Sequence, residues 1–431
     1  MSNELERLLD FRDLREEIRG SEKHLVVGID VAKEKHHAYF GTPAGKSFRR
    51  RFAFSNDRAG FDSLRALASD IAMQHGLSPI VFGLEPTGIY HKPLLAHLIQ
   101  EGERAVLVSN VAVQRNRELL DGRWDKNDVS DSANVADLVG QARCLFPDDP
   151  TPDLRDLRGF VRARTRLKKR ELTLRMRIRN HLIAQYFPEL EAAYGKASGA
   201  NDSVVLRIVE QCFDPAQIAQ MPFDAFWSQV CMPRWNKHHQ ARVRAVWQAA
   251  TQSIGCPLDD AARWEAPRLV QLLKTVREDL GELEQRMSQV AKRMPGYASV
   301  ISIPGLGPVL SALLLAAIGD PYRFEHPRQV LRLAGLDLCA RRSGKASDRA
   351  VPRISKQGKA PLRYALVHAA MIGARTNPAV RRYFSQRLSG REKERGIRRK
   401  MYVKLAAKLL VVAWTLMRRG DTFSAEAFVD T

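Results

Sequence analysis

The stretch His24–Val31, HLVVGIDV, is a nearly continuous run of apolar residues with one carboxylate, Asp30, close to its end. An apolar run of this length is typical of a strand that is buried on both faces of a sheet. A carboxylate at the end of such a strand is costly unless it is paired or binds a cation. The stretch therefore predicts a central strand of an α/β sheet, ending in a charge that needs a partner.

The residues that follow predict the rest of one α/β domain. Their apolar patterns and turn residues predict, in order, strands at about 36–40 and 47–54, a helix at 57–76, a strand at 79–84, a helix at 92–101, a strand at 105–108 and a helix that begins at Asp128. This order is that of an RNase H-like (RuvC-like) sheet. We predict this α/β fold for the N-terminal domain, a helical coiled-coil middle and a mostly α-helical C-terminal domain.

Four carboxylates are expected to meet at one edge of this sheet. Glu85 ends the fourth strand as Asp30 ends the first, and these two strands are neighbours in the RNase H-like topology. Asp128 and Asp131 are three residues apart at the start of the last helix, so both lie on one helix face. Such a cluster requires divalent cations, and carboxylate oxygens suit Mg²⁺ or Mn²⁺. The alternatives are a helix-capping role for Asp128 and a surface position for Asp131.

The middle of the chain is expected to form a long helical arm. Apolar residues from Leu269 to Met294 alternate spacings of three and four, which predicts a heptad seam whose partner is the basic helix 154–185. A small helical cap at about 195–255 would join the two helices. Whether the arm mediates self-association or packs only within its own chain is open. The predicted domains are an N-terminal helical extension (1–23), the α/β domain (24–149), the arm with its cap (150–294) and the C-terminal domain (295–431).

Composition excludes several classes of protein. The chain has 431 residues, of which 45% are hydrophobic, as expected for a globular protein. No apolar run is long enough to span a membrane, and the charged N-terminus does not resemble a signal peptide, so we expect a cytoplasmic, bacterial protein. The five cysteines are scattered, which argues against a disulfide framework. Cys231 with His238 and His239 is a weak hint of a metal cluster that lacks a fourth ligand.

The positive charge of the chain is concentrated in two segments. The formal net charge is +21, and residues 341–419 hold 22 Lys/Arg against three acidic residues. Residues 155–179 hold 11 basic and two acidic residues. Such segments favour a polyanionic partner, because each neutralised phosphate releases condensed counterions. We therefore expect nucleic acid, and not a membrane surface, as the partner.

Three motifs resemble a known family. The segments VVGIDVAKEKH, GLEPTGIYHKPL and KNDVSDSANVADL are similar to the DEDD domain of insertion-sequence transposases of the one-hundred-and-ten family, whose relatives include Piv-type invertases and bridge-RNA-guided recombinases. The resemblance implies that Asp30, Glu85, Asp128 and Asp131 are the catalytic, Mg²⁺-binding residues. Asn127 departs from the usual threonine of the motif. The resemblance also implies DNA as substrate, a structured noncoding RNA as guide, and a homo-oligomer, dimer or tetramer.

The C-terminal domain carries a second resemblance to the same family. The segments IPGLGPVLSALLLAAIGD and RLAGLDLCARRSGKASDRAVPRISKQGKAPLRYALVHAA are similar to its transposase domain, in which a loop serine is the nucleophile. The match places this serine at Ser343, with Ser347 and Ser355 as alternatives in the same loop. In that family the carboxylates and the serine of one active site come from different protomers. The implied activity is a transposase or site-specific recombinase that exchanges DNA strands through a phosphoserine link.

The remaining basic residues are expected to contact phosphates. The predicted nucleic-acid-binding residues are Arg341, Arg342, Lys345, Lys356, Lys359, Arg363, Arg381, Arg382, Arg398 and Arg399 in the C-terminal domain, and Lys168, Lys169 and Arg170 on the basic helix. Two rival functions remain, a hydrolytic RuvC-like nuclease and a non-enzymatic protein that organises nucleic acid. A tyrosine recombinase that uses Tyr364 or Tyr402 is disfavoured, because the Arg-His-Arg pattern of that class is absent.

Overall fold

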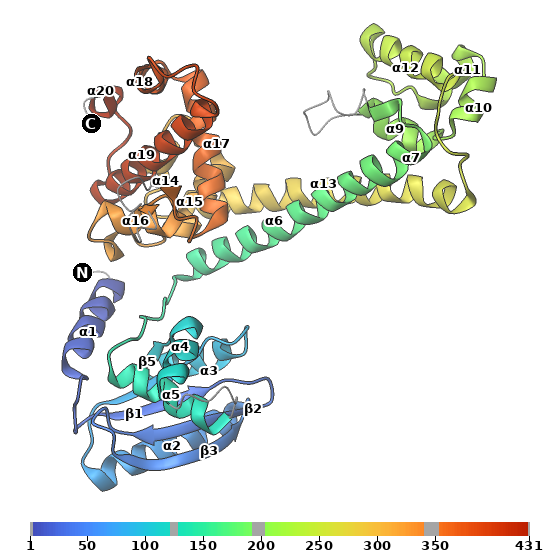
Figure 1. The fold of residues 1–431 in the computed structure, drawn as a ribbon. Coiled ribbons are helices and arrows are strands. Elements are labelled where there is room, and N and C mark those ends of the chain that lie inside the picture. The colour runs from blue at the N-terminus through green and yellow to red at the C-terminus, as the bar shows by residue number, and fades with distance from the viewer. Residues whose placement is uncertain (1–2, 121–127, 192–202, 340–352, 430–431) are drawn as a thin grey trace, which may run out of the picture. The chain divides into compact units, whose positions relative to one another are not determined.

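The computed structural model describes residues 3–120, 128–191, 203–339 and 353–429 (Figure 1). The chain divides into two compact units, residues 1–149 and 150–431. None of the described helices has the length and apolar character needed to cross a membrane.

The first unit contains a five-stranded mixed sheet with helices on both faces. Its elements are α1 (Asn3–Glu17), β1 (Leu25–Asp30), β2 (Lys35–Gly41), β3 (Ser47–Ser55), α2 (Arg58–His75), β4 (Ile80–Leu84), α3 (His91–Gln100), β5 (Arg104–Leu107), α4 (Asn110–Leu120) and α5 (Asp128–Gly140). The strand order is β3-β2-β1-β4-β5. β1 is antiparallel to β2 and parallel to β4, and β5 is parallel to β4. The predicted α/β class is confirmed, whereas helix α4 was not predicted.

The central strand β1 is buried on both faces, as its sequence predicts. Leu25, Val27 and Ile29 belong to a core that they share with α2 and α3. Val26 belongs to a second core on the opposite face, which contains residues of α1, α4 and α5. The alternation of neighbouring side chains between two cores explains why this strand has no polar residue before Asp30.

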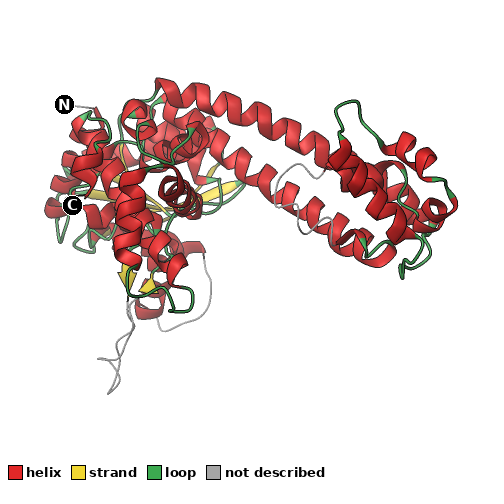
Figure 2. Cartoon of the chain, turned by 90° about the horizontal axis from the view of Figure 1, so that it is seen from above, coloured by secondary structure: helices red, strands yellow, loops and turns green. Residues whose placement is uncertain are grey.

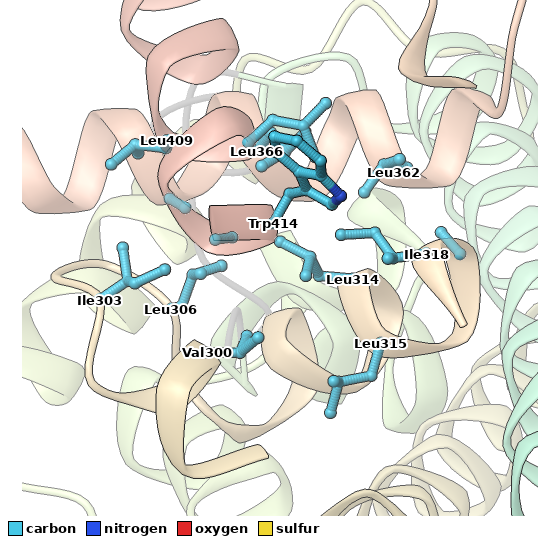
Figure 3. Close-up of a cluster of buried hydrophobic side chains, with 14 of the residues drawn as sticks. Val300, Ile303, Leu306, Leu314, Leu315, Ile318, Leu362, Leu366, Leu409 and Trp414 are labelled. Atoms are coloured by element: carbon cyan, nitrogen blue, oxygen red, sulfur yellow. The ribbon is translucent and has the colours of Figure 1, made fainter. Parts of the chain in front are cut away.

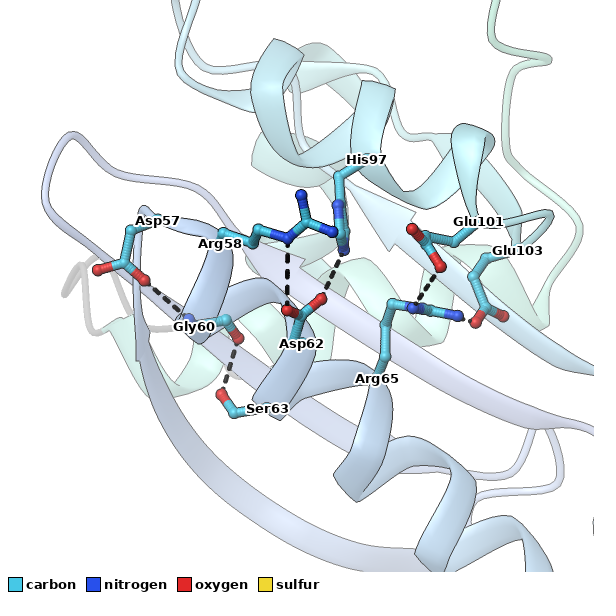
Figure 4. A network of polar contacts seen from close by, with 9 residues as sticks. All are labelled: Asp57, Arg58, Gly60, Asp62, Ser63, Arg65, His97, Glu101 and Glu103. Carbon is cyan, nitrogen blue, oxygen red and sulfur yellow. Dashed lines mark hydrogen bonds and ion pairs between the residues drawn. The ribbon is translucent and has the colours of Figure 1, made fainter.

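A polar network fixes α2 against the neighbouring elements of its face (Figure 4). The Asp57 carboxylate caps α2 by accepting a hydrogen bond of 2.8 Å from the Gly60 N–H, and this bond holds the pKa of Asp57 below its usual value. Arg65 of α2 forms ion pairs with Glu101 and Glu103, which flank the turn before β5, each at 2.9 Å. These contacts set the position of α2 relative to the sheet.

The second unit is almost entirely helical. Its elements are α6 (Pro152–Arg177), the π-helix η1 (Ile178–Ile183), α7 (Ala184–Tyr186), α9 (Ser203–Gln211), α10 (Pro215–Gln220), α11 (Phe223–Val230), α12 (Lys237–Ala250), α13 (Asp260–Arg293), α14 (Tyr297–Ile301), α15 (Pro308–Ile318), the 3₁₀-helix η2 (Pro321–Arg323), α16 (Pro327–Ala334), β6 (Leu338–Cys339), β7 (Arg353–Ile354), α17 (Ala360–Thr376), α18 (Pro378–Leu388), α19 (Ile397–Arg419) and α20 (Ala425–Val429). β6 and β7 form a two-stranded antiparallel sheet.

The helices α6 and α13 lie side by side as an antiparallel pair (Figures 1 and 2). Their direction follows from three ion pairs, Arg293–Asp153, Arg164–Glu284 and Arg277–Glu171, in which the residue number falls along α13 as it rises along α6. The predicted seam of α13 is buried except at Leu283, which is half-buried. The short helices α9–α12 lie at one end of this pair. The helices α6 and α13 together are hereafter called the arm.

The helices after the arm enclose one large apolar core (Figure 3). Leu314, Leu315 and Ile318 of α15 meet Leu362 and Leu366 of α17 and Leu409 and Trp414 of α19 there. Helix α15 is buried from Ser311 to its last residue, Ile318, because this part of its sequence is apolar on nearly every side. This core supports the basic helices on which the predicted phosphate contacts lie.

Candidate functional site

Asp30 ends β1 and Glu85 comes directly after β4, the parallel neighbour of β1, at the same edge of the sheet. β1 and β4 pair in a register that sets Ile29 opposite Leu84, so the two carboxylates come next on adjacent strands. The Glu85 N–H also donates to the Ile29 carbonyl at 3.4 Å. Both acidic residues are half-buried. The backbones of these two residues therefore lie side by side at this edge of the sheet.

Helix α5 crosses β1 and β4 at unusually close range, and two glycines permit this. A Cβ atom built on Gly28 of β1 would lie 2.2 Å from the Ser132 carbonyl oxygen and 2.5 Å from the Ala136 nitrogen. A Cβ on Gly83 of β4 would lie 2.5 Å from a methyl group of Val139. These contacts place the first turns of α5 over the part of β1 that leads to Asp30.

Asp131 of α5 is deeply buried and faces a cation from another helix. Its exposed fraction is 2%, so the alternative of a surface position is wrong. The Arg117 guanidinium of α4 lies 2.5 Å from Asp131 Oδ1. This pair has the distance of an ion pair but not the geometry of a hydrogen bond, because within the described residues neither Asp131 Oδ1 nor Arg117 Nε has a hydrogen-bond partner. A buried carboxylate oxygen without a donor suits a metal cation.

Helix α4 is held on α5 by a buried amide network that the sequence did not predict. Asn116 Nδ2 donates to Asn134 Oδ1 at 2.7 Å and to Asp137 Oδ2 at 2.8 Å. Asn134 Nδ2 in turn donates to the Val113 carbonyl at 2.8 Å. Asp137 is therefore half-buried and bonded. The network fixes the helix that delivers Arg117 to Asp131.

A buried histidine holds the loop that follows Asp30. The Ala32 N–H donates to His36 Nδ1 at 3.1 Å, so this ring nitrogen is an acceptor. Burial lowers the pKa of His36, and the neutral imidazole that results is the form able to accept this bond. Sequence reasoning assigned no role to His36, although it lies only six residues after Asp30.

The residues of the first unit suit a divalent cation by their chemistry, without forming a complete set of ligands. Asp30, Glu85 and Asp131 are hard oxygen donors on elements that meet at one sheet edge. Among the described side chains, no group of three His, Cys, Asp or Glu residues lies close enough to hold a metal ion. The side chain of Asp128, at the first position of α5, is outside the described part of the chain.

The predicted serine nucleophile lies outside the described residues. Ser343, its alternative Ser347 and the flanking Arg341, Arg342 and Lys345 all fall within residues 340–352. The sheet of β6 and β7 immediately flanks this segment in the sequence. Ser355, the second alternative, is described, and its hydroxyl donates to Asp337 Oδ1 at 2.5 Å while its N–H donates to the Asp337 carbonyl. These bonds give Ser355 a structural role beside the two strands.

Several of the predicted phosphate contacts also bind the protein itself. Lys359 Nζ donates to the Ala317 carbonyl near the end of α15, and Arg363 donates to the Ala334 carbonyl at the end of α16, both at 2.8 Å. Arg381 donates to two carbonyl groups at the end of α17. Lys168 forms an ion pair with Glu171 at 3.0 Å. The other described members of the set are exposed: Lys169, Arg170, Lys356, Arg382, Arg398 and Arg399.

The hint of a metal site in the cap has an ordinary explanation. His239 belongs to a capping box at the start of α12, in which its Nδ1 accepts from the Asn236 N–H and its own N–H donates to Asn236 Oδ1. His238 is exposed, and the Cys231 thiol donates to the Ser228 carbonyl at 3.7 Å. These contacts account for His239 and Cys231 without a metal.

Comparison with known proteins agrees with the motifs. Residues 27–188 match the DEDD transposase family of IS110, and residues 297–385 match the family described as "Transposase IS116/IS110/IS902 family". Together the two matches cover more than half of the chain.

Curated relatives align over most of their length. An uncharacterized 43.6 kDa protein of insertion element IS110 from Streptomyces coelicolor is 25% identical over 93% of this chain and 95% of its own. An uncharacterized 42 kDa protein of IS900 from Mycobacterium paratuberculosis is 25% identical over 91% and 95%. The transposase for IS1111A from Coxiella burnetii is 23% identical over 70% of each chain. The chain therefore belongs to the IS110 family of insertion-sequence transposases, enzymes that transpose DNA.

Proposed function

We propose that this transposase exchanges DNA strands at a metal-dependent site made by Asp30, Glu85, Asp128 and Asp131, with Ser343 as the nucleophile. The observation that carries the proposal is the position of Asp30 and Glu85 at the ends of adjacent parallel strands, under a helix whose Asp131 is 2% exposed. The strand order β3-β2-β1-β4-β5 supports an RNase H-like, that is RuvC-like, fold for this unit.

The carboxylates would bind Mg²⁺ or Mn²⁺. Such cations, when bound, stabilise charge on the attacking and leaving oxygens of phosphoryl transfer. The chain's own residues orient the ligands: His36 holds the loop after Asp30, and Gly28 lets α5 approach β1. Arg117 compensates the buried charge of Asp131, and this ion pair would loosen when a cation binds.

The serine step is a phosphoryl transfer with a covalent intermediate. Ser343 Oγ loses its proton to a base and attacks a DNA phosphorus atom, while the bond from phosphorus to one sugar oxygen breaks. That sugar oxygen takes up a proton and leaves as a free hydroxyl group. Attack on the phosphoserine by the hydroxyl of another strand restores the serine and closes the new backbone. The bond count is conserved, so no external energy source is needed.

The charge and shape of the second unit support the proposed partners. The basic segments 155–179 and 341–419 suit donor and target DNA, and a structured noncoding RNA as guide. The paired helices α6 and α13 suit a coiled-coil contact in a homo-oligomer. The four domains expected from the sequence, with the extension before residue 24 and the arm at 150–294, are part of this proposal.

The test measures recombination of donor and target DNA by purified variants in the presence of Mg²⁺. We expect Asp30→Asn, Asp131→Asn and Ser343→Ala each to lower strand exchange by at least about a hundredfold, because each removes a group that contacts the reacting phosphate or its cation. Asp70→Asn is the matched control for the carboxylates, since Asp70 is exposed on α2. Ser347→Ala is the control for the nucleophile.

The rival functions predict different outcomes. A hydrolytic nuclease would leave nicks with free ends and would lose little activity in Ser343→Ala. A non-enzymatic protein would bind DNA equally well in Asp30→Asn and would show no strand exchange in any form. Full activity in Ser343→Ala together with inactivity in Ser347→Ala would move the nucleophile to Ser347. Denaturing gels that resolve the covalent protein–DNA species separate these cases.

A further inference from the structure

The face of the first unit formed by α4 and the end of α5 contains a polar cavity that the proposed reaction does not use. Its volume is about 290 Å³. The residues that line it are Ser109, Val111, Ala112, Arg115, Asn116, Leu138 and Arg143. No acidic side chain is among them, so the walls carry only positive charge.

The two arginines of this cavity have no partner among the residues that the structure describes. Arg115 and Arg143 are both exposed, and within the described residues neither forms an ion pair or a hydrogen bond through its guanidinium. Arg117, two residues beyond Arg115 on the same helix, shows the contrast, since it is half-buried and paired with Asp131. Two uncompensated guanidinium groups beside one cavity favour an anionic ligand with several acceptor oxygens.

The backbone that carries Arg143 is held firmly. Ala142 is buried and has a φ of 58°, a left-handed conformation that is uncommon for a residue other than glycine. Its carbonyl accepts a hydrogen bond of 3.1 Å from Arg15 Nε, and the Arg143 N–H donates to the Leu138 carbonyl at 2.9 Å. Leu145 then pairs with Leu107 of β5 through two backbone bonds. The turn therefore presents Arg143 from a fixed position.

The cavity also adjoins the edge of the sheet that carries the carboxylates. Ser109 precedes α4, and its carbonyl accepts from the N–H groups of Ala112 and Val113. Asn110 Nδ2 donates to the carbonyl of Pro86, the residue after Glu85, at 3.3 Å. A ligand in the cavity therefore lies beside the segment that follows Glu85.

We propose that this cavity binds an internal phosphodiester of a nucleic-acid strand and so positions that strand beside the carboxylates. The two guanidinium groups and the Ser109 hydroxyl match the acceptor oxygens of a phosphate, and the exposed apolar side chain of Val111 suits the adjoining sugar. Such contacts fix the register of a strand without reading its bases. This inference rests on the proposed function of the adjacent carboxylates.

The test measures the affinity of the full-length protein for a fluorescently labelled single-stranded oligonucleotide over a series of salt concentrations. We compare the double variant Arg115→Gln/Arg143→Gln with Arg50→Gln, an exposed arginine on β3 that has no partner in the described chain. We expect the double variant to bind roughly tenfold more weakly whatever the base sequence. The plot of log affinity against log salt concentration has a negative slope, and its magnitude should decrease by about 0.7, the value for one phosphate contact on a single strand. Unchanged thermal melting establishes that the variants fold.

Three outcomes decide the inference. Equal losses for oligonucleotides with and without a 5′-phosphate support an internal phosphodiester. A loss confined to the 5′-phosphorylated oligonucleotide overturns it in favour of a site for strand ends. The inference is also overturned if the double variant has the same affinity and the same salt slope as Arg50→Gln. The binding assay needs neither metal nor Ser343, so its result is independent of the proposed reaction. If Ser343→Ala abolishes strand exchange but the cavity variants bind normally, the proposed function stands and only the cavity site is refuted.

Discussion

Gly28 shows how one residue without a side chain sets the position of the candidate site. The nearest atoms to a Cβ at this position belong to the backbone of α5, which cannot rotate away as a side chain can. Asp131 lies on α5, so its position depends on how closely α5 approaches β1 at Gly28. The sequence displays both residues but not their dependence on each other.

Gly28→Ala should therefore displace α5 and destabilise the first unit. Overpacking of a close contact typically costs about 1–3 kcal/mol, and here the contact is with backbone. We expect a lower melting temperature and a loss of strand exchange that exceeds the loss of folded protein. Gly281→Ala on α13 is the control, because a Cβ there meets nothing within 4 Å. The control should stabilise its helix by about 0.5–1 kcal/mol, since alanine favours helix over glycine. Equal melting of Gly28→Ala and wild type would contradict the close approach of α5.

At the scale of elements, the strands of the first unit were predictable because each is a compact apolar run between turn residues. Helix α4, in contrast, has the sequence NVAVQRNRELL, in which polar residues outnumber apolar ones. Its packing depends on the buried amides Asn116 and Asn134, whose pairing appears only when α4 and α5 come together. The ion pair between Arg117 and Asp131 was not predicted for the same reason, because Arg117 lies on α4. The positions of Asp30 and Glu85 at one edge of the sheet were predictable, because they depend only on where two neighbouring strands end.

One of the carboxylates that pair α6 with α13, Glu171, is buried and binds two cations. Glu171 of α6 is 8% exposed and pairs with Lys168 at 3.0 Å and with Arg277 of α13 at 3.3 Å. Burial would raise the pKa of Glu171, but Lys168 and Arg277 together outweigh burial and lower it. Because the pKa of Glu171 is lower in the folded chain than in the unfolded chain, its ionised carboxylate stabilises the folded chain at pH values above the ordinary carboxyl pKa. This contribution disappears as the pH falls through the folded-state pKa.

Glu171→Gln should destabilise the arm by about 1–2 kcal/mol at neutral pH, because Arg277 loses its charged partner. The difference from the wild type should shrink as the pH falls from the ordinary carboxyl range through the lowered pKa of folded Glu171, because the native glutamate then also becomes neutral. Chemical denaturation followed by circular dichroism at several pH values measures both effects. Glu278→Gln, at an exposed position of α13, should leave stability nearly unchanged. A pH-independent difference would show that Glu171 acts through packing and not through its charge.

For the whole molecule, the decisive property is the placement of charge. The formal net charge of +21 arises from the helical second unit, whose basic segments include the arm and the C-terminal helices. Several of these cations already hold helix ends, as Lys359 and Arg363 do, so the exposed remainder must provide most of the affinity for phosphates. A surface of this kind binds any polyanion at low salt. The identity of the natural partner is therefore best tested at high salt, where only specific contacts persist.

We expect the protein to retain one discrete structured RNA when it is expressed with the noncoding DNA that flanks its gene and washed at high salt. Counterion release weakens binding through phosphates alone by several orders of magnitude at high salt, whereas an RNA held by shape and by many contacts remains bound. Sequencing of the bound nucleic acid identifies the RNA and its position beside the gene. The same purification without the flanking DNA is the control and should yield no such species. Recovery of random fragments in both preparations would contradict RNA guidance and would favour an invertase that recognises DNA through the protein alone.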